Sequence, residues 1–320
     1  MAAAMTRAEQ YLENEDPFRR NAFLIIEKMV ELASEKESPA HPSVLVDEVL
    51  HSIFFLGEIK NEPKYSPKDI LVDEDVLNKL KGLYPQPFDK FSTQLPKRAP
   101  FSCVLDMVVN LNGQQNEDEI KNRLKEFTLK LKKGEATALV SNTICVSQKN
   151  TAQDSVRYYG VSMSTSDRIP GEIIVAASCC KKWDSYVADA VMTYYSRDKK
   201  KQKKSYFDGT IKLPEQVRCK AFSLTDGTLM APCRSCGNMF GLTTSETKEW
   251  PYGNCAEAES LSNLLKNENE TREQVQQPSD TCTPANRQKA VENVKKLLKE
   301  HVNMQQFKRW DGDFYTPQGN

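Results

Sequence analysis

Residues 220–265 read KAFSLTDGTLMAPCRSCGNMFGLTTSETKEWPYGNCAEAESLSNLL. In this stretch Cys233 and Cys236 lie close together directly after a proline, and Cys255 follows a linker, two residues before Glu257. Three thiols and one carboxylate suit a catalytic zinc site, in which water takes the fourth position and the glutamate moves protons. A structural zinc site normally has four protein ligands. We therefore predict that the three cysteines bind Zn²⁺ beside Glu257.

The first half of the cluster is predicted to follow a strand and to open a short helix. Residues 221–230 are typical of one strand that is broken or bulged at Gly227. Pro232 fits the first turn of a helix, where its missing N–H costs nothing. Cys233 and Cys236 then become neighbours on the helix surface, so that one ion can contact both.

The second half is predicted to begin another helix. Asn254 is a good N-cap, and Cys255 follows it immediately. Glu257 falls in the first turn, where the helix dipole favours a carboxylate and where it stays close to anything bound at Cys255. Glu259 lies about 200° further round the helix, so we expect it at the surface.

These two halves resemble the zinc-binding motifs of the cytidine deaminase-like superfamily of nucleoside and nucleotide deaminases. PCRSC (232–236) resembles their P-C-x-x-C motif, and GNCAEAESLSNLL (253–265) resembles the segment in which Cys or His, Ala and Glu begin a helix. The order is reversed here, with P-C-x-x-C first.

The resemblance implies a zinc-dependent hydrolytic deaminase. Its ligands would be Cys233, Cys236 and Cys255, and Glu257 would carry protons to and from a cytosine- or adenine-type base. The implied substrate is a nucleobase in a nucleoside, a nucleotide or a nucleic acid. Residues that could stack on a base are Phe240, Trp250 and Tyr252, although aromatic residues near a metal site more often serve packing.

The rest of the chain is predicted to form an α/β fold with a mainly helical N-terminal region. Residues 1–112 show helical spacing interrupted by prolines between 63 and 100, and they carry no recognisable chemistry. We interpret them as an accessory region that offers a surface for a protein partner. Residues 113–310 form the α/β domain, a mixed sheet flanked by helices as the resemblance implies, and 311–320 form a loosely held tail.

Within the α/β domain, periodicity and turn residues predict the main elements. Helices are expected over 120–131, 173–195 and 289–307, and a strand hairpin over 136–146 and 156–165. The polar composition of residues 266–288 is typical of a loop or linker.

Other interpretations of the cluster remain open. Cys219 or Cys282 could add a fourth ligand and make the zinc structural, in a non-catalytic regulatory or interaction protein. A deaminase-like domain without activity and a redox-active CxxC pair are further alternatives.

Composition bounds the cellular setting. Forty-four basic residues balance forty-four acidic ones, which gives no global bias toward nucleic acids or membranes. The sequence has no long apolar run and no apolar centre near its N-terminus, so neither a membrane segment nor export is expected. The odd count of nine cysteines favours reduced thiols in the cytoplasm. The basic run 197–204 is interpreted as a solvated loop, with a phosphate-binding loop or a nuclear import signal as alternatives.

Overall fold

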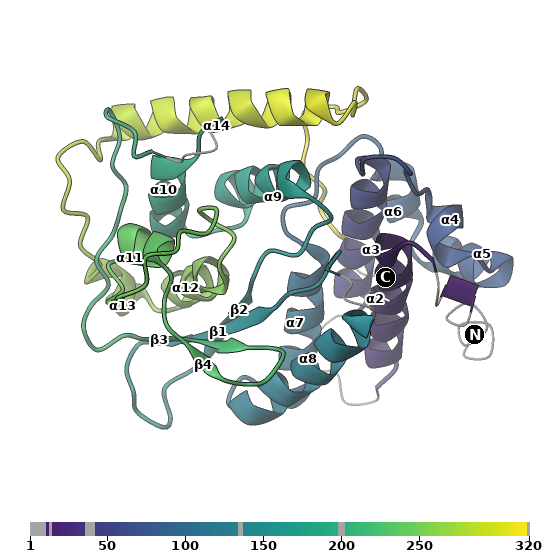
Figure 1. Cartoon of the computed structure of the whole chain (residues 1–320), viewed down its shortest axis with the longest axis horizontal. Helices are drawn as coiled ribbons and strands as arrows, with labels where there is room; N and C mark the ends of the chain where they lie inside the picture. Colours follow the sequence, from purple (N-terminus) through teal and green to yellow (C-terminus); the bar gives the residue numbers. More distant parts are fainter. Residues whose placement is uncertain (1–10, 13–14, 36–41, 134–136, 198–201, 319–320) are drawn as a thin grey trace.

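The computed structural model describes residues 11–12, 15–35, 42–133, 137–197 and 202–318. Within them the chain folds around a small sheet with helices on both faces, and the helices nearest the N-terminus gather at one side of it (Figure 1). The predicted α/β class and the mainly helical N-terminal region are confirmed. Residues 198–201 of the basic run 197–204 lie outside the described residues.

Prolines begin most of the helices that precede the sheet. These helices are α2 (Pro17–Ala33), α3 (Pro42–Glu58), α4 (Pro67–Leu71), α5 (Glu74–Leu83), α6 (Pro85–Lys90), α7 (Pro100–Asn112) and α8 (Glu117–Leu131). A proline fits the first helical position because its N–H would have no partner there. Of the prolines expected to interrupt this region, Pro67, Pro85 and Pro100 therefore mark helix starts. In α2, Asp16 adds a side-chain cap by accepting a hydrogen bond from the Phe18 amide at 2.9 Å.

The sheet is antiparallel in each of its three pairings. Its strands are β1 (Thr143–Gln148), β2 (Tyr158–Val161), β3 (Arg218–Ser223) and β4 (Leu229–Met230), in the order β2-β1-β3-β4. The predicted hairpin is confirmed as β1 and β2. The single broken strand over 221–230 is wrong, because Gly227, at φ +84°, lies in a turn that folds β4 back on β3.

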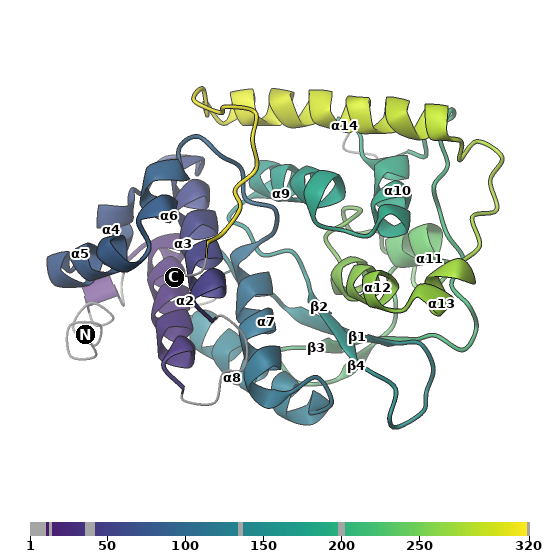
Figure 2. The same ribbon diagram turned by 180° about the vertical axis from the view of Figure 1, so that it is seen from behind.

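The remaining helices are α9 (Arg168–Lys181), α10 (Ser185–Tyr194), α11 (Arg234–Phe240), α12 (Ala256–Asn267), α13 (Asn269–Glu273) and α14 (Pro284–Met304). The single helix predicted over 173–195 is wrong. The first helix ends at Lys181, and Asp184 caps the start of α10 by accepting a hydrogen bond from the Tyr186 amide at 2.9 Å. The short α13 lies inside the polar stretch 266–288, and α14 packs across α9 and α10 (Figure 2).

Each face of the sheet is covered by a different helix. Alternate residues of β3 point to opposite faces. On one face, the Lys121 ammonium of α8 lies 4.4 Å from the centre of the Phe222 ring. On the other face, Ala221 packs against Ala256 of α12. Cys255 lies at the start of α12, so this alternation determines which strand residues lie near the candidate site.

The C-terminal segment is held against the N-terminal helices, so the predicted loose tail is wrong. The Tyr315 amide donates a hydrogen bond to the Leu95 carbonyl at 2.8 Å. The Tyr315 ring stacks on His51 with 3.7 Å between centres, and its hydroxyl donates to Asp47. Tyr315 is consequently buried.

The N-terminal helices and the α/β region share one hydrophobic core. Buried residues from α2 through α14 belong to a single cluster, and α7 packs against both α3 and β2. Among the described residues, no helix combines the length and the apolar character needed to cross a bilayer.

Candidate metal centre

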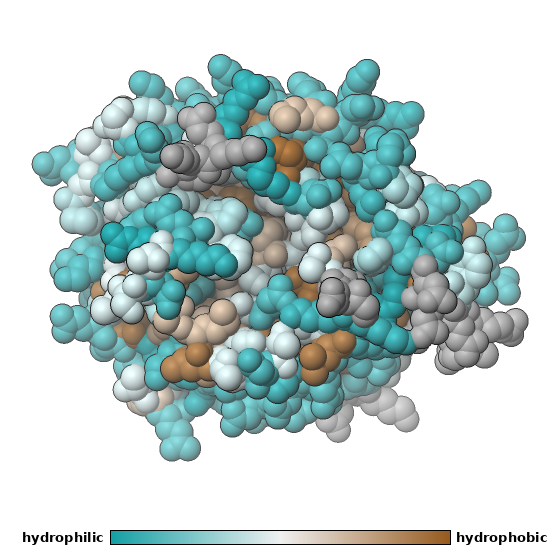
Figure 3. All heavy atoms as spheres, viewed as in Figure 1, coloured by the Kyte–Doolittle hydropathy of each residue, from teal (hydrophilic) through white to brown (hydrophobic). Residues whose placement is uncertain are grey.

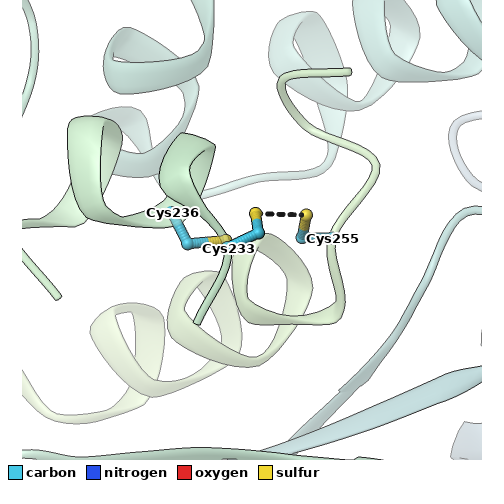
Figure 4. Close-up of side chains that lie close together, drawn as sticks. All are labelled: Cys233, Cys236 and Cys255. Carbon is cyan, nitrogen blue, oxygen red and sulfur yellow. Dashed lines mark hydrogen bonds between the residues drawn. The ribbon is translucent and has the colours of Figure 1, made fainter. Parts of the chain in front are cut away.

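The three predicted cysteine ligands come together. The sulfur atoms of Cys233, Cys236 and Cys255 all lie within 4.8 Å of one another, and those of Cys233 and Cys255 are 3.4 Å apart (Figure 4). All three are free thiols. Three converging thiols are a donor set that zinc prefers, so this cluster, called the cysteine cluster below, can hold a metal ion.

Helix α11 and the linker after it fix the first two cysteines. The sequence predicted that Pro232 lies in the first turn of this helix, and that prediction is wrong. Cys233 is the N-cap of α11, just before its first residue, so Pro232 precedes the helix. The Arg234 amide donates to the Lys248 carbonyl at 3.0 Å, and the Ser235 hydroxyl donates to the Trp250 carbonyl at 2.6 Å. The linker is thereby held beside the start of α11.

Helix α12 delivers the third cysteine. Cys255, and not the predicted Asn254, is its N-cap residue. The helix lies directly on β2, because a Cβ at Gly160 would be only 2.3 Å from the Ser260 amide nitrogen. The Ser260 hydroxyl also lies 2.8 Å from that of Ser147 on β1. These contacts set the height of the start of α12 above the sheet.

Glu259 anchors the same helix, and its predicted surface position is wrong. Its side chain is buried and accepts a hydrogen bond from the Val161 amide at 2.9 Å. The sequence placed it correctly on a different side of α12 from Glu257, but that side faces β2 instead of water.

The thiols share protons unequally. Hydrogen bonds from Cys236 and Cys255 lower the pKa of Cys233 to about 2. The hydrogen bond to Cys233 raises the pKa of each of the other two thiols. The neighbouring thiols thus stabilise a thiolate at Cys233. Cys236 and Cys255 must also lose their protons before all three sulfurs can act as ligands, and a bound cation favours that loss.

Glu257 is a buried acid next to the cluster. Its side chain is 5% exposed. Burial raises the pKa of its carboxyl, the negative charge of Cys233 raises it further, and a hydrogen bond from Cys236 lowers it. The carboxyl is therefore within interaction distance of two of the three ligands and is biased toward holding a proton.

A cavity of about 270 Å³ opens over the cluster and Glu257. It lies where the strands end, between the start of α12 and the linker. Its lining residues are Asn142, Thr143, Ser162, Met163, Ala221, Met230, Ala231, Cys233, Trp250, Pro251, Asn254, Cys255, Ala256 and Glu257. Apolar side chains interrupt the hydrophilic surface over β3 and β4 (Figure 3), where Leu229 and Met230 are exposed.

The three aromatic candidates have different positions. Trp250 lines the cavity and is exposed, with the Lys248 ammonium 3.8 Å from its ring centre. Tyr252 is buried and stacks on Tyr194, with 4.0 Å between the ring centres. Phe240 is fully buried. Only Trp250 of the three is among the residues that line the cavity.

Neither proposed fourth cysteine ligand joins the cluster in the described part of the chain. The Cys219 sulfur lies 3.6 Å from that of Cys145 on the neighbouring strand. Cys282 lies near Asp189 and Asp208 instead. Among the described residues, the group that could hold a metal ion consists of Cys233, Cys236 and Cys255.

Sequence reasoning missed the polar residues that line the cavity. Asn142 directly precedes β1, Thr143 is the first residue of β1, and Ser162 follows β2, so the open end of the hairpin brings them together. The Ser162 hydroxyl accepts hydrogen bonds from the Asn142 and Thr143 amides at 3.1 and 3.2 Å. The predicted hairpin could have indicated this arrangement, because the residues at its open end must lie side by side.

Comparison with known proteins gives no further assignment. No family model matches the chain, no curated protein matches it, and no solved structure matches its fold. The interpretation of the site therefore depends on its own geometry.

Proposed function

We propose that this protein is a zinc-dependent hydrolytic deaminase that acts on a cytosine- or adenine-type base in a nucleoside, a nucleotide or a nucleic acid. The observation that carries the proposal is a three-thiol cluster next to a buried acid, with Cys233, Cys255 and Glu257 among the residues that line one cavity. A hydrolytic site needs these three parts in one place: a metal position with a free coordination site, a proton carrier and room for a substrate.

The number of cysteines favours a catalytic site over a structural one. A structural zinc is normally held by four protein ligands, whereas the described group has three. A fourth position is then left for water. The cavity above the cluster gives that water and a planar base access to the same place.

Zinc, when bound, lowers the pKa of a coordinated water to about 7 and so supplies hydroxide at neutral pH. Glu257 moves the protons of the reaction. Its carboxylate takes one proton from the attacking water and delivers it to the ring nitrogen beside the amine-bearing carbon, to which the C–O bond forms. It then takes the proton of the added hydroxyl group and delivers it to the amine. The C–N bond breaks and ammonia leaves, so that water and the aminated base become ammonia and the oxo base.

Two other features fit a base in the cavity. Trp250 offers an exposed aromatic face at the rim, and stacking on such a face is compatible with any base. Asn142 and Asn254 bring amide side chains, which can both donate and accept hydrogen bonds, to the same lining.

The test measures zinc content and ammonia release together. Zinc-loaded protein is incubated with a panel of nucleosides, nucleotides and single-stranded nucleic acids. We expect one zinc per chain and ammonia from at least one substrate. Glu257→Gln should keep its zinc and lose the activity, because the amide cannot carry the proton.

Matched controls separate loss of the acid from general damage. Glu246→Gln changes an exposed acid in the linker and should leave ammonia release unchanged. Cys282→Ser changes a thiol outside the cluster and should leave the zinc content unchanged. Equal ammonia release from wild type and Glu257→Gln would contradict the catalytic role. Bound zinc with no ammonia from any substrate would favour the structural alternative.

A further inference from the structure

A second pair of thiols lies beneath the start of α12. The sulfur atoms of Cys145 on β1 and Cys219 on β3 are 3.6 Å apart, and neither is disulfide-bonded. The register of the sheet pairs Cys145 with Ala221, two residues from Cys219. The two thiols therefore occupy diagonal positions on the same face of the sheet.

Small side chains surround this pair. Cys145, Cys219, Ala221 and Ala256 form a separate apolar cluster under the first turn of α12. Because alanines flank the sulfurs, no large side chain of that cluster stands between them. A disulfide requires the two sulfurs, now 3.6 Å apart, to approach to about 2 Å. This movement is much smaller than the distance of about 4.8 Å between neighbouring strands.

The two thiols differ in access. Cys145 is fully buried, whereas Cys219 is half-buried. Burial also raises the pKa of Cys145. Cys219 is thus the thiol that an oxidant can reach first, and Cys145 is placed to react with whatever forms on it.

One edge of the Cys219 segment is not paired with β4. β4 pairs with Ala221 and Phe222 of β3 and does not extend to Cys219 in the described register. Residues 218–220 of β3 are therefore held in the sheet by β1 alone. A shift of Cys219 toward Cys145 would therefore break no pairing with β4.

We propose that Cys145 and Cys219 are a reversible oxidation site that forms a disulfide with hydrogen peroxide. The Cys219 thiolate attacks peroxide, so that an S–O bond forms, the O–O bond breaks and the released hydroxide is protonated to water. The Cys145 sulfur then attacks that sulfenic acid. An S–S bond forms, the S–O bond breaks, and the hydroxide leaves as water with the Cys145 proton. Two thiols are oxidised, and one peroxide is reduced to two waters.

The geometry also favours easy reduction of this bond. A disulfide between diagonal positions departs from relaxed geometry, and strained disulfides have higher reduction potentials. The pair is therefore suited to switching and not to permanent stabilisation. This inference does not depend on the proposed deaminase activity.

The test uses the full chain loaded with zinc, first reduced and then exposed to hydrogen peroxide. Remaining thiols are alkylated under denaturing conditions, and the digest is analysed by mass spectrometry. We expect a cross-linked peptide pair that contains Cys145 and Cys219, lighter by two hydrogen atoms than the reduced pair and lost on treatment with dithiothreitol. In Cys145→Ala, Cys219 should instead be trapped as a sulfenic acid by dimedone.

Controls address folding and selectivity. Cys219→Ser alters only a half-buried position and should abolish the cross-link, leaving Cys145 available for alkylation after denaturation. Cys180→Ser and Cys282→Ser, which remove other half-buried thiols, should leave the cross-link unchanged. Oxygen on Cys219 without a cross-link in the wild type would overturn the proposal. So would a peroxide-induced disulfide that joins Cys233 to Cys255 in place of this pair.

Discussion

Replacing Gly160 with alanine tests how the third cysteine is positioned. The added Cβ would lie 2.3 Å from the Ser260 amide nitrogen and 2.5 Å from the Ala256 carbonyl oxygen. Both are backbone atoms of α12, and ordinary contacts begin near 3.4 Å. Helix α12 must therefore move away from β2 by about 1 Å, because no flexible side chain can absorb the overlap.

That displacement has two measurable costs. Overpacking of a tight contact typically lowers the free energy of unfolding by about 1–3 kcal/mol. The moved helix also begins at Cys255 and carries Glu257, and metal–ligand distances tolerate errors of only about 0.2 Å. Zinc affinity should fall by about 10- to 100-fold, as it does when support around metal ligands is lost.

Urea unfolding and competition with a chromophoric chelator measure the two effects separately. The matched control is Gly82→Ala, at an exposed position in α5 where an added Cβ meets nothing within 4 Å. It should raise stability by about 0.5–1 kcal/mol, since alanine is the better helix former, and leave zinc affinity unchanged. If Gly160→Ala behaves like Gly82→Ala in both assays, contact with β2 does not position the cysteine cluster.

Three further predictions test other parts of the structure. Cys236→Ser should lose zinc during dialysis against a chelator, as metal analysis will show; retention of zinc would exclude Cys236 as a ligand. Burial raises the pKa of Glu117, but hydrogen bonds and charge from Arg218 outweigh burial and lower it to about 2. Its stabilising effect is present above pH 4.5 and is lost as the pH falls toward 2. The free energy of unfolding should therefore drop by about 2 kcal/mol between about pH 5 and pH 3, a drop that urea titrations should not find in Glu117→Gln. Tyr315→Phe removes the hydroxyl that donates to buried Asp47 and should cost about 1–2 kcal/mol in the same assay; an unchanged midpoint would mean that this hydrogen bond does not hold the C-terminal segment.

Local signals in the sequence predicted what local interactions decide. The convergence of Cys233, Cys236 and Cys255 was expected from two helix starts, each recognisable from neighbouring residues. The β1–β2 hairpin was likewise visible in two β-rich runs separated by a polar turn. The starts of these two helices moved by one or two residues, because a cysteine instead of its neighbour caps each helix.

The errors occurred where distant parts of the chain meet. Glu259 looked exposed because helical periodicity gives its direction but not the strand that covers it. Tyr315 looked loose because its partners, Leu95 and Asp47, lie more than two hundred residues earlier in the chain. Asp184 was a local cap signal inside an apolar stretch, and the long run of helical periodicity concealed it.

The central claim is that the metal has three sulfur ligands and one open position beside Glu257. X-ray absorption spectroscopy of the zinc-loaded protein counts the ligands directly. We expect three sulfurs at about 2.3 Å and one oxygen near 2.0 Å. Four sulfurs around the zinc would contradict the claim, because no position would remain for the attacking water.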